Sequence, residues 1–369
     1  MRGASHGRIA TILVVVGLSL PGMAVSLCSY RPSETSIADA RAAATYRYYD
    51  DATTAGIDVN AGTLSLDALR LVDAPAHGLT LSGSLSMALD AFVPGAWLAR
   101  CSGSYRLYPW HGGLFYVFGG SEAVAVRGAL RPSLDARVGL GLGRYSDVSP
   151  LARAMRIEEV LLDLGALRGP LSNDVLLYVA GLVAERAATS SVQDVVAELK
   201  AVVEFDGGTQ LDARALLSIE EILASPLPDR FCGWSAQIGV GYELLDPFGA
   251  LQTPVVVGSF DAAMAVSPRD QWLVQLAVSC PLALRREGVF TAHLGYAMDL
   301  GGASTMTAAI DVVRLQPGGG TTVTTTSAGL ALEFRLGIGA VGLEVGVARS
   351  TGDPGWSLNV ALSASVELL

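Results

Sequence analysis

The chain has almost no lysine and few basic side chains for its size. Its 369 residues include 35 Asp and Glu against 25 Lys and Arg, the formal net charge is −10, and Lys200 is the one lysine. Nucleic-acid binding needs basic side chains clustered on one face, because these charges neutralise phosphates. The composition therefore excludes nucleic acid as a partner.

The chain also lacks the short motifs of common catalytic and cofactor sites. It contains no Gx4GK[ST] phosphate loop, no HExxH, no GxSxG and no CxxC. We therefore expect no enzyme activity, no cofactor and no metal site. The hydrolase-like alternative is a set of His77 with Ser82 or Ser84, which would have to meet at one surface.

No apolar run is long enough for a transmembrane helix. The segment IATILVVVGLSL has about a dozen residues, whereas a membrane-spanning helix needs roughly 20. It follows Arg2 and Arg8 and precedes PGMA, which together form the three parts of a secretory signal. We predict a signal peptide over residues 1–24, cleaved after Ala24. A lipid-modified Cys28 is the alternative N-terminus.

The other three cysteines do not form a metal-binding pattern. Cys101, Cys232 and Cys280 are far apart in the chain, and none has a second cysteine at metal-ligand spacing. Each lies an even number of residues from a tryptophan of its own segment, so the two side chains would share one face of a strand. We therefore predict that they are small apolar residues on packed faces.

Much of the chain alternates apolar and polar side chains with a period of two residues. In FCGWSAQIGVGYELL, residues 231–245, Trp234, Ile238 and Val240 share one parity, while Ser235 and Gln237 share the other. This is the pattern of a strand with one apolar and one polar face. Similar runs recur along the chain with turn-forming clusters such as SPRDQ and QPGGG between them, and they predict an antiparallel meander of about 14 strands. The predicted strands lie near residues 40–50, 54–72, 78–91, 95–108, 113–127, 132–146, 231–245, 251–266, 271–284, 288–300, 303–315, 321–336, 338–349 and 356–369. The segment 54–72 could also be a hairpin.

Three features indicate that the apolar parity faces lipid. Many of these strands have about ten or more residues, which is the length that a tilted strand needs to cross a bilayer. The polar parity is built mainly from Gly, Ser, Thr and Ala, which suits a lumen. Aromatic residues lie near strand ends, where membrane interfaces would place them. These aromatics are Trp97, Tyr105, Trp110, Trp234, Tyr242, Trp272, Tyr296 and Trp356. The alternative is a soluble, exported β-sandwich or barrel.

Residues 150–228 have a helical period instead. Ser149 followed by Pro150 suits an N-cap and a first helical position. Helices are predicted over LARAMRIEEVLLDLG, NDVLLYVAGLVAERA, SVQDVVAELKAVVE and LDARALLSIEEILA. The adjacent glutamates 158/159 and 220/221 would need histidines for a di-metal bundle, and the segment has none, so we interpret them as solvated.

With its signal peptide and repeated amphipathic strands, the chain resembles a bacterial outer-membrane β-barrel protein of porin-like architecture. Such proteins usually end in an aromatic residue, whereas this chain ends in Leu369. The resemblance implies an outer-membrane, lipid-embedded barrel formed by residues 25–148 and 230–369, with a helical insert over 149–229. Because even-numbered strands return to the periplasm in this class, an insert after the sixth strand is predicted to be periplasmic.

The lumen is the predicted location of function. An acidic excess there would favour cations, so we predict a passive channel for small solutes with mild cation preference. The alternative is a structural or interaction protein that docks a periplasmic partner through the insert. The candidate lumen-facing residues are Asp135, Arg137, Gln237, Glu243, Asp261, Gln275, His293, Asp299, Asp311, Glu333, Arg335 and Glu344.

Overall fold

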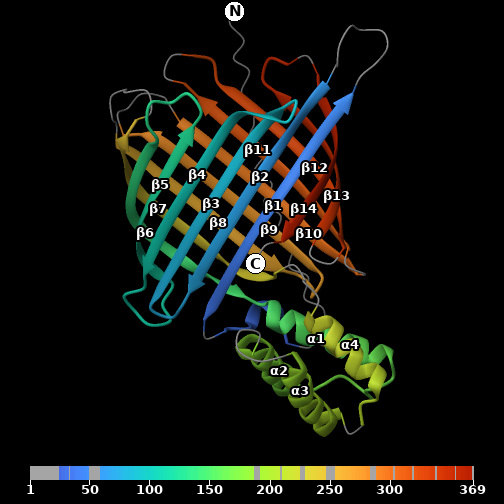
Figure 1. Ribbon diagram of the computed structural model, residues 1–369. Coiled ribbons are helices and arrows are strands. Elements are labelled where there is room, and N and C mark those ends of the chain that lie inside the picture. The colour runs from blue at the N-terminus through green and yellow to red at the C-terminus, as the bar shows by residue number, and fades with distance from the viewer. Residues whose placement is uncertain are drawn as a thin grey trace, which may run out of the picture.

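The computed structural model contains a closed barrel of 14 antiparallel strands with a helical unit at one end (Figure 1). The structure describes residues 25–32, 34–49, 59–186, 192–207, 210–224, 229–246, 254–282, 288–301, 304–317, 320–336, 339–353 and 355–367. The predicted signal peptide and its cleavage site lie outside these ranges, as does Leu369.

Each strand pairs with its neighbours in the chain, and the first pairs with the last. The strands are β1 (Thr35–Tyr49), β2 (Val59–Asp73), β3 (His77–Asp90), β4 (Val93–Leu107), β5 (Phe115–Val126), β6 (Ser133–Asp147), β7 (Phe231–Leu245), β8 (Pro254–Ala265), β9 (Asp270–Pro281), β10 (Gly288–Gly301), β11 (Ser304–Gln316), β12 (Val323–Leu336), β13 (Gly339–Ser350) and β14 (Ser357–Glu367). The predicted meander and its strand count are confirmed. The described part of segment 54–72 belongs to one strand, β2.

The apolar parity of the strands faces outward, as predicted. In β7, Trp234, Ile238 and Val240 are exposed, while Ser235 is 5% exposed on the opposite face. No second sheet covers the outer face among the described residues, so the soluble sandwich alternative is wrong. Exposed aromatics gather towards both barrel ends, among them Tyr105 and Trp272 at one and Trp97 and Trp356 at the other. This is the arrangement of two interfacial girdles.

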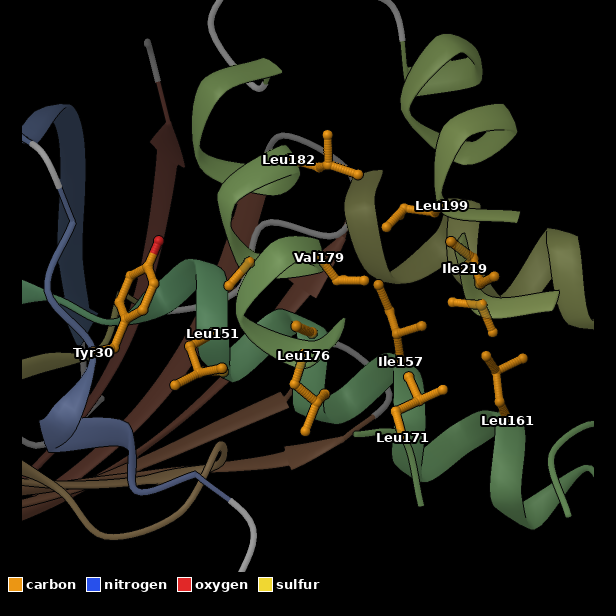
Figure 2. Packing of buried hydrophobic residues seen from close by; sticks show 14 of the residues in the cluster. Tyr30, Leu151, Ile157, Leu161, Leu171, Leu176, Val179, Leu182, Leu199 and Ile219 are labelled. Carbon is orange, nitrogen blue, oxygen red and sulfur yellow. The ribbon is translucent and has the colours of Figure 1, made fainter. Parts of the chain in front are cut away.

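The helical insert is a small folded unit with its own core. It comprises α1 (Ser149–Asp163), α2 (Asn173–Arg186), α3 (Val192–Gly207) and α4 (Ala213–Ala224). Figure 2 shows leucine, isoleucine and valine side chains of these helices meeting between them. Leu161 and Leu199 are fully buried, and each such side chain stabilises the unit by roughly 1.5–3 kcal/mol. None of the described helices is both long and apolar enough to span a membrane.

Two local predictions about the insert are corrected. The N-cap of α1 is Val148, and Pro150 lies in the first helical turn. The helix begins one residue earlier because the Asp147 carboxylate accepts the Ser149 N–H at 2.8 Å, which replaces the predicted Ser149 cap. Glu158 is buried rather than solvated, and its carboxylate accepts the Leu171 N–H at 2.6 Å.

A disulfide joins the chain before the barrel to the barrel wall. Cys28, in a short 3-10 helix (η1, Leu27–Ser29), is bonded to Cys232 of β7, with their Cα atoms 5.1 Å apart. The prediction that Cys232 is a simple packed thiol is therefore wrong, and Cys28 is not free to carry a lipid. Cys101 and Cys280 are free thiols, but Cys101 is exposed rather than packed.

Polar contacts fix α1 against the same end of the barrel, here called the insert end. Arg156 of α1 forms an ion pair with Asp299 at the end of β10, and Glu159 pairs with Arg269 at 3.1 Å. The Ser149 hydroxyl accepts the backbone N–H of Arg230 at 2.8 Å. The insert is therefore held by ion pairs and hydrogen bonds, and the disulfide fixes η1 to β7 in the same buried cluster. The opposite end of the barrel is called the distal end.

Candidate functional site

The register shows which predicted residues share the lumen face. Directly opposed residues in an antiparallel sheet point to the same side. Asp261 lies opposite Gln275, Gln275 opposite His293, and His293 opposite Asp311. This row crosses four neighbouring strands at mid-height. Within it, His293 Nδ1 and Asp311 Oδ1 are 2.7 Å apart.

One lumen cavity lies towards the distal end of β4–β10. It has a volume of about 550 Å³, and its walls include Arg137, Gln237 and Glu243. Glu122 of β5 receives two arginines: Arg100 Nε is 3.1 Å from its carboxylate, and Arg137 binds its other oxygen. Because Glu122, Asp135 and Glu243 lie opposite one another in register, three carboxylates form a row across three strands.

Asp135 and Glu243 make no ion pair within 4.0 Å in the described part of the chain, whereas Glu122 is shared between two arginines. The two basic side chains of this wall are thus both engaged by one carboxylate. The remaining two carboxylates leave the cavity with an acidic excess.

A second cavity, of about 290 Å³, lies along β11–β14. Its walls include Asp311, Glu344, Ser357 and Asn359, together with small residues such as Gly346. No lysine or arginine contributes to these walls within the described residues. The polar side chains of this cavity are therefore neutral or acidic.

At the insert end the opposite half of the lumen is filled. The Tyr116 side chain has no exposed surface. It reaches from β5 across β6 to β7, where its hydroxyl lies 2.6 Å from the Ser235 hydroxyl. A Cβ on Gly141 would lie 2.2 Å from the Tyr116 ring. The absence of a side chain at Gly141 therefore makes the space that the tyrosine occupies.

Arginines cover these aromatics on the lumen side. The Arg144 guanidinium lies 4.0 Å from the Tyr108 ring centroid, and Arg106 lies 5.8 Å from that of Tyr116. Such cation–π contacts are worth about 2 kcal/mol or more when desolvated. Asp73, whose side chain is fully buried, lies 3.8 Å from Arg144. The lumen is therefore filled on the β4–β7 side at this end.

The predicted lumen residues are distributed over several places. Asp135, Arg137, Gln237 and Glu243 line the larger cavity, and Asp311 and Glu344 line the smaller one. Asp299 is 3% exposed beneath α1 and does not face an open lumen. Glu333 and Arg335 pair with each other at 3.4 Å.

Sequence reasoning missed Glu122 and the aromatics beside it. The lumen parity of β5 carries Tyr116, Phe118, Glu122 and Val124, while the outward parity carries residues such as Gly119 and Ser121. The lumen face of this strand thus carries large apolar side chains as well as Glu122, and its outward face carries small ones from Gly119 onward. Glu122 was hidden by that pattern, although it could have been found as the one acidic residue of the segment.

The hydrolase-like set is not assembled. His77 and Ser82 lie an odd number of residues apart on β3 and so point to opposite faces. The His77 ring stacks on Tyr105 at 6.1 Å, whereas the Ser82 hydroxyl lies 2.6 Å from that of Ser102. The described residues contain no group of three or more His, Cys, Asp or Glu side chains suited to a metal ion.

The sequence matches no family model and no curated protein. Among solved structures, the outer membrane channel DcaP of Acinetobacter baumannii aligns at 8% identity over 92% of this chain and 99% of that one, with a TM-score of 0.37. OpdK of Pseudomonas aeruginosa, solved with vanillate, aligns at 8% identity over 90% and 98%, with a TM-score of 0.33. OmpT of Vibrio cholerae, a loop-deletion mutant, aligns at 10% identity over 91% and 100%, also with a TM-score of 0.33. The similarity to these three proteins extends over at least 90% of both chains in each alignment.

Proposed function

We propose that this protein is an outer-membrane channel for small solutes with a mild preference for cations. The observation that carries the proposal is the charged distal cavity of about 550 Å³ inside a closed barrel. A barrel with an apolar outer face requires lipid around it, and a charged interior requires water. Membrane fractionation with heat-modifiable migration on a gel tests the location.

The cation preference is attributed to Asp135 and Glu243. These carboxylates line the cavity, and no arginine pairs with them within ion-pair distance in the described residues. Rings or rows of carboxylates favour cations in a conducting pore. In planar bilayers under a salt gradient, we expect a reversal potential of cation sign, reduced by Asp135→Asn with Glu243→Gln.

A matched control changes acidic charge away from the cavity. Glu221 of α4 is exposed on the insert, and Glu221→Gln should leave the reversal potential unchanged. An anion-selective current in the unaltered protein would contradict the cation preference. A purified, folded barrel that gives no current would contradict the channel itself.

The alternative function is supported by exposed apolar side chains on the insert. Phe205 of α3 is 92% exposed and Leu217 of α4 is 64% exposed. Large apolar residues held in water on a rigidly attached unit are a feature of protein-binding surfaces. A non-conducting barrel whose insert photocrosslinks to one periplasmic protein through position 205 would favour this interaction role over the channel.

A further inference from the structure

The two strands that close the barrel are paired over a shorter stretch than any other neighbours. Pairing between β1 and β14 runs from Arg41–Glu367 to Ala44–Ala364, which is four residue pairs. Every other pair of neighbouring strands is in register over at least ten. Continued register would place Thr45 opposite Ser363, but no pairing follows Ala44–Ala364 in the described strands.

We call the unpaired region the distal seam; it comprises residues 45–49 of β1 and 357–363 of β14. Backbone N–H and C=O groups cannot face hydrocarbon without a partner, because no water is available there to bond them. Such an edge is tolerated where it is buried in protein or lines a water-filled cavity. At the distal seam, unlike at the other seams of the barrel, the backbone N–H and C=O groups must therefore be satisfied by something other than a neighbouring strand.

The outer side of the distal seam is apolar and highly exposed. Leu358, Val360 and Leu362 of β14 are 70%, 60% and 70% exposed. Leu343 and Val345, on the fully paired neighbour β13, are 41% and 39% exposed. Over this stretch, β14 has no paired strand on the β1 side.

The inner side of the same stretch is polar and acidic. Ser357 and Asn359 of β14 line the smaller lumen cavity, and Asp311 and Glu344 supply its carboxylates. No lysine or arginine lines it in the described part of the chain. A single stretch of β14 thus has a leucine- and valine-rich face outside and an acidic cavity inside, with no strand sealing its edge.

We propose that the distal seam is a lateral opening that admits an amphiphile with a cationic head and an alkyl chain. The head would occupy the cavity beside Asp311 and Glu344, and the chain would lie over Leu358, Val360 and Leu362. The polar edge then lines the wet cavity, while the apolar outer side contacts the chain. This deepens the proposed channel function, on which it rests, by naming a class of solute and its route between lumen and bilayer.

The open seam is tested by cysteine pairs that share one residue. In a background with Cys101→Ser and Cys280→Ser, the pair Thr45→Cys with Thr63→Cys spans the paired β1–β2 seam, where the two native hydroxyls are 2.5 Å apart. The pair Thr45→Cys with Ser363→Cys spans the distal seam. Under mild oxidation in vesicles, we expect the first pair to form a disulfide and the second to keep free thiols. Equal rates of disulfide formation for the two pairs would show that β1 and β14 are also paired along the distal seam, and would overturn the proposal.

The occupant is tested by protection of a single cysteine from a thiol reagent. In phosphatidylcholine vesicles, dodecyltrimethylammonium below its micellar concentration should slow labelling of Asn359→Cys several-fold. Tetramethylammonium, which has no chain, and dodecyl sulfate, which has an anionic head, should not. Ser102→Cys, on the lumen face of β4, is the matched control and should be unaffected. Protection by dodecyl sulfate, by all three probes, or by none would overturn the proposal.

Neither measurement needs an ionic current. If the seam is open and the cation amphiphile protects Asn359→Cys in a barrel that gives no current, the ion channel fails while the lateral site stands. If the barrel conducts and the seam crosslinks like the control, the lateral site fails while the channel stands.

Discussion

At the scale of single residues, the barrel wall is shaped by where side chains are missing as well as by where they are present. Gly141 of β6 lies opposite Tyr116 of β5 and Gln237 of β7, and the tyrosine ring occupies the space above it. The hydroxyl of Tyr116 on β5 can therefore hydrogen-bond with Ser235 on β7, two strands away. This contact anchors the aromatic filling at the insert end.

We expect Gly141→Ala to destabilise the barrel. The added Cβ would lie 2.2 Å from the Tyr116 ring, which is fully buried and is held through its hydroxyl by Ser235. Overpacking of this kind costs about 1–3 kcal/mol. The midpoint of urea unfolding in vesicles measures the change. Gly329→Ala is the lumen-facing control, because a Cβ there meets only the Val345 carbonyl oxygen at 3.9 Å; equal effects would contradict the packing argument.

The alternation of side chains predicted the faces of most strands, because parity is a local property that needs no partner. It could not predict the contact between Tyr116 and Gly141, since that depends on the register between strands. It also failed for Glu122, because the lumen face of β5 carries aromatic and valine side chains. The positions of the isolated charges were thus predictable, whereas the ion pairs among them were not.

At the scale of elements, the most consequential link is between η1 and β7. The two bonded cysteines are 204 residues apart in sequence, and no spacing rule connects them. Leu27 and Tyr30 flank the disulfide and are buried in the same cluster as the insert helices. The alternation of β7 explains Cys232 as one of its apolar positions, but it gives no sign of the bond.

We expect Cys28→Ser to loosen the segment before the barrel and the insert packed on it. A native disulfide typically contributes about 2–4 kcal/mol, mainly by restricting the unfolded chain. Limited proteolysis should therefore cut the insert of the variant faster than that of the unaltered protein, and reductant should reproduce the effect. Cys101→Ser is the control, since that thiol is free and exposed. Equal cleavage of all three proteins would show that the insert is held without the disulfide.

The buried carboxylate of α1 makes the insert sensitive to pH. Burial raises the pKa of Glu158 above its ordinary value, and the Leu171 N–H opposes the shift. The folded insert therefore binds this proton more tightly than the unfolded chain does. Its stability is greatest below the ordinary glutamate pKa and falls as the pH rises towards the raised value.

We expect Glu158→Gln to remove this fall. The amide oxygen can still accept the Leu171 N–H, and no charge is buried at higher pH. The stability of the variant relative to the unaltered protein should therefore rise between about pH 4 and pH 7, as measured by thermal unfolding of the insert. Glu221→Gln, at an exposed position of α4, should show no such trend. A constant difference for Glu158→Gln across this range would contradict a buried, titrating carboxyl.

At the scale of the whole molecule, the barrel is asymmetric in two directions. Across the barrel, one wall has aromatics and arginines while the other has small polar residues and the weakly paired seam. Along its axis, one end carries the helices (Figure 1) and the disulfide. Under the proposed channel function, both asymmetries bear on which solutes enter and from which side, so the orientation of the barrel in the membrane matters.

The insert follows the sixth of 14 strands, and β1 begins at the same end of the barrel. Outer-membrane barrels of this kind begin and end on the periplasmic side, so we expect the insert in the periplasm and the distal end outside the cell. The test uses two highly exposed positions at opposite ends: Phe205 of α3, and Leu130 in the turn between β5 and β6, which is 96% exposed.

In the background with Cys101→Ser and Cys280→Ser, a membrane-impermeant thiol reagent should label Leu130→Cys in intact cells. Phe205→Cys should react only after the outer membrane is permeabilised. The two positions control for each other, because both are almost fully accessible in the folded protein and differ only in the end at which they lie. Labelling of Phe205→Cys alone before permeabilisation would reverse the orientation, placing the insert at the cell surface and the distal cavity towards the periplasm.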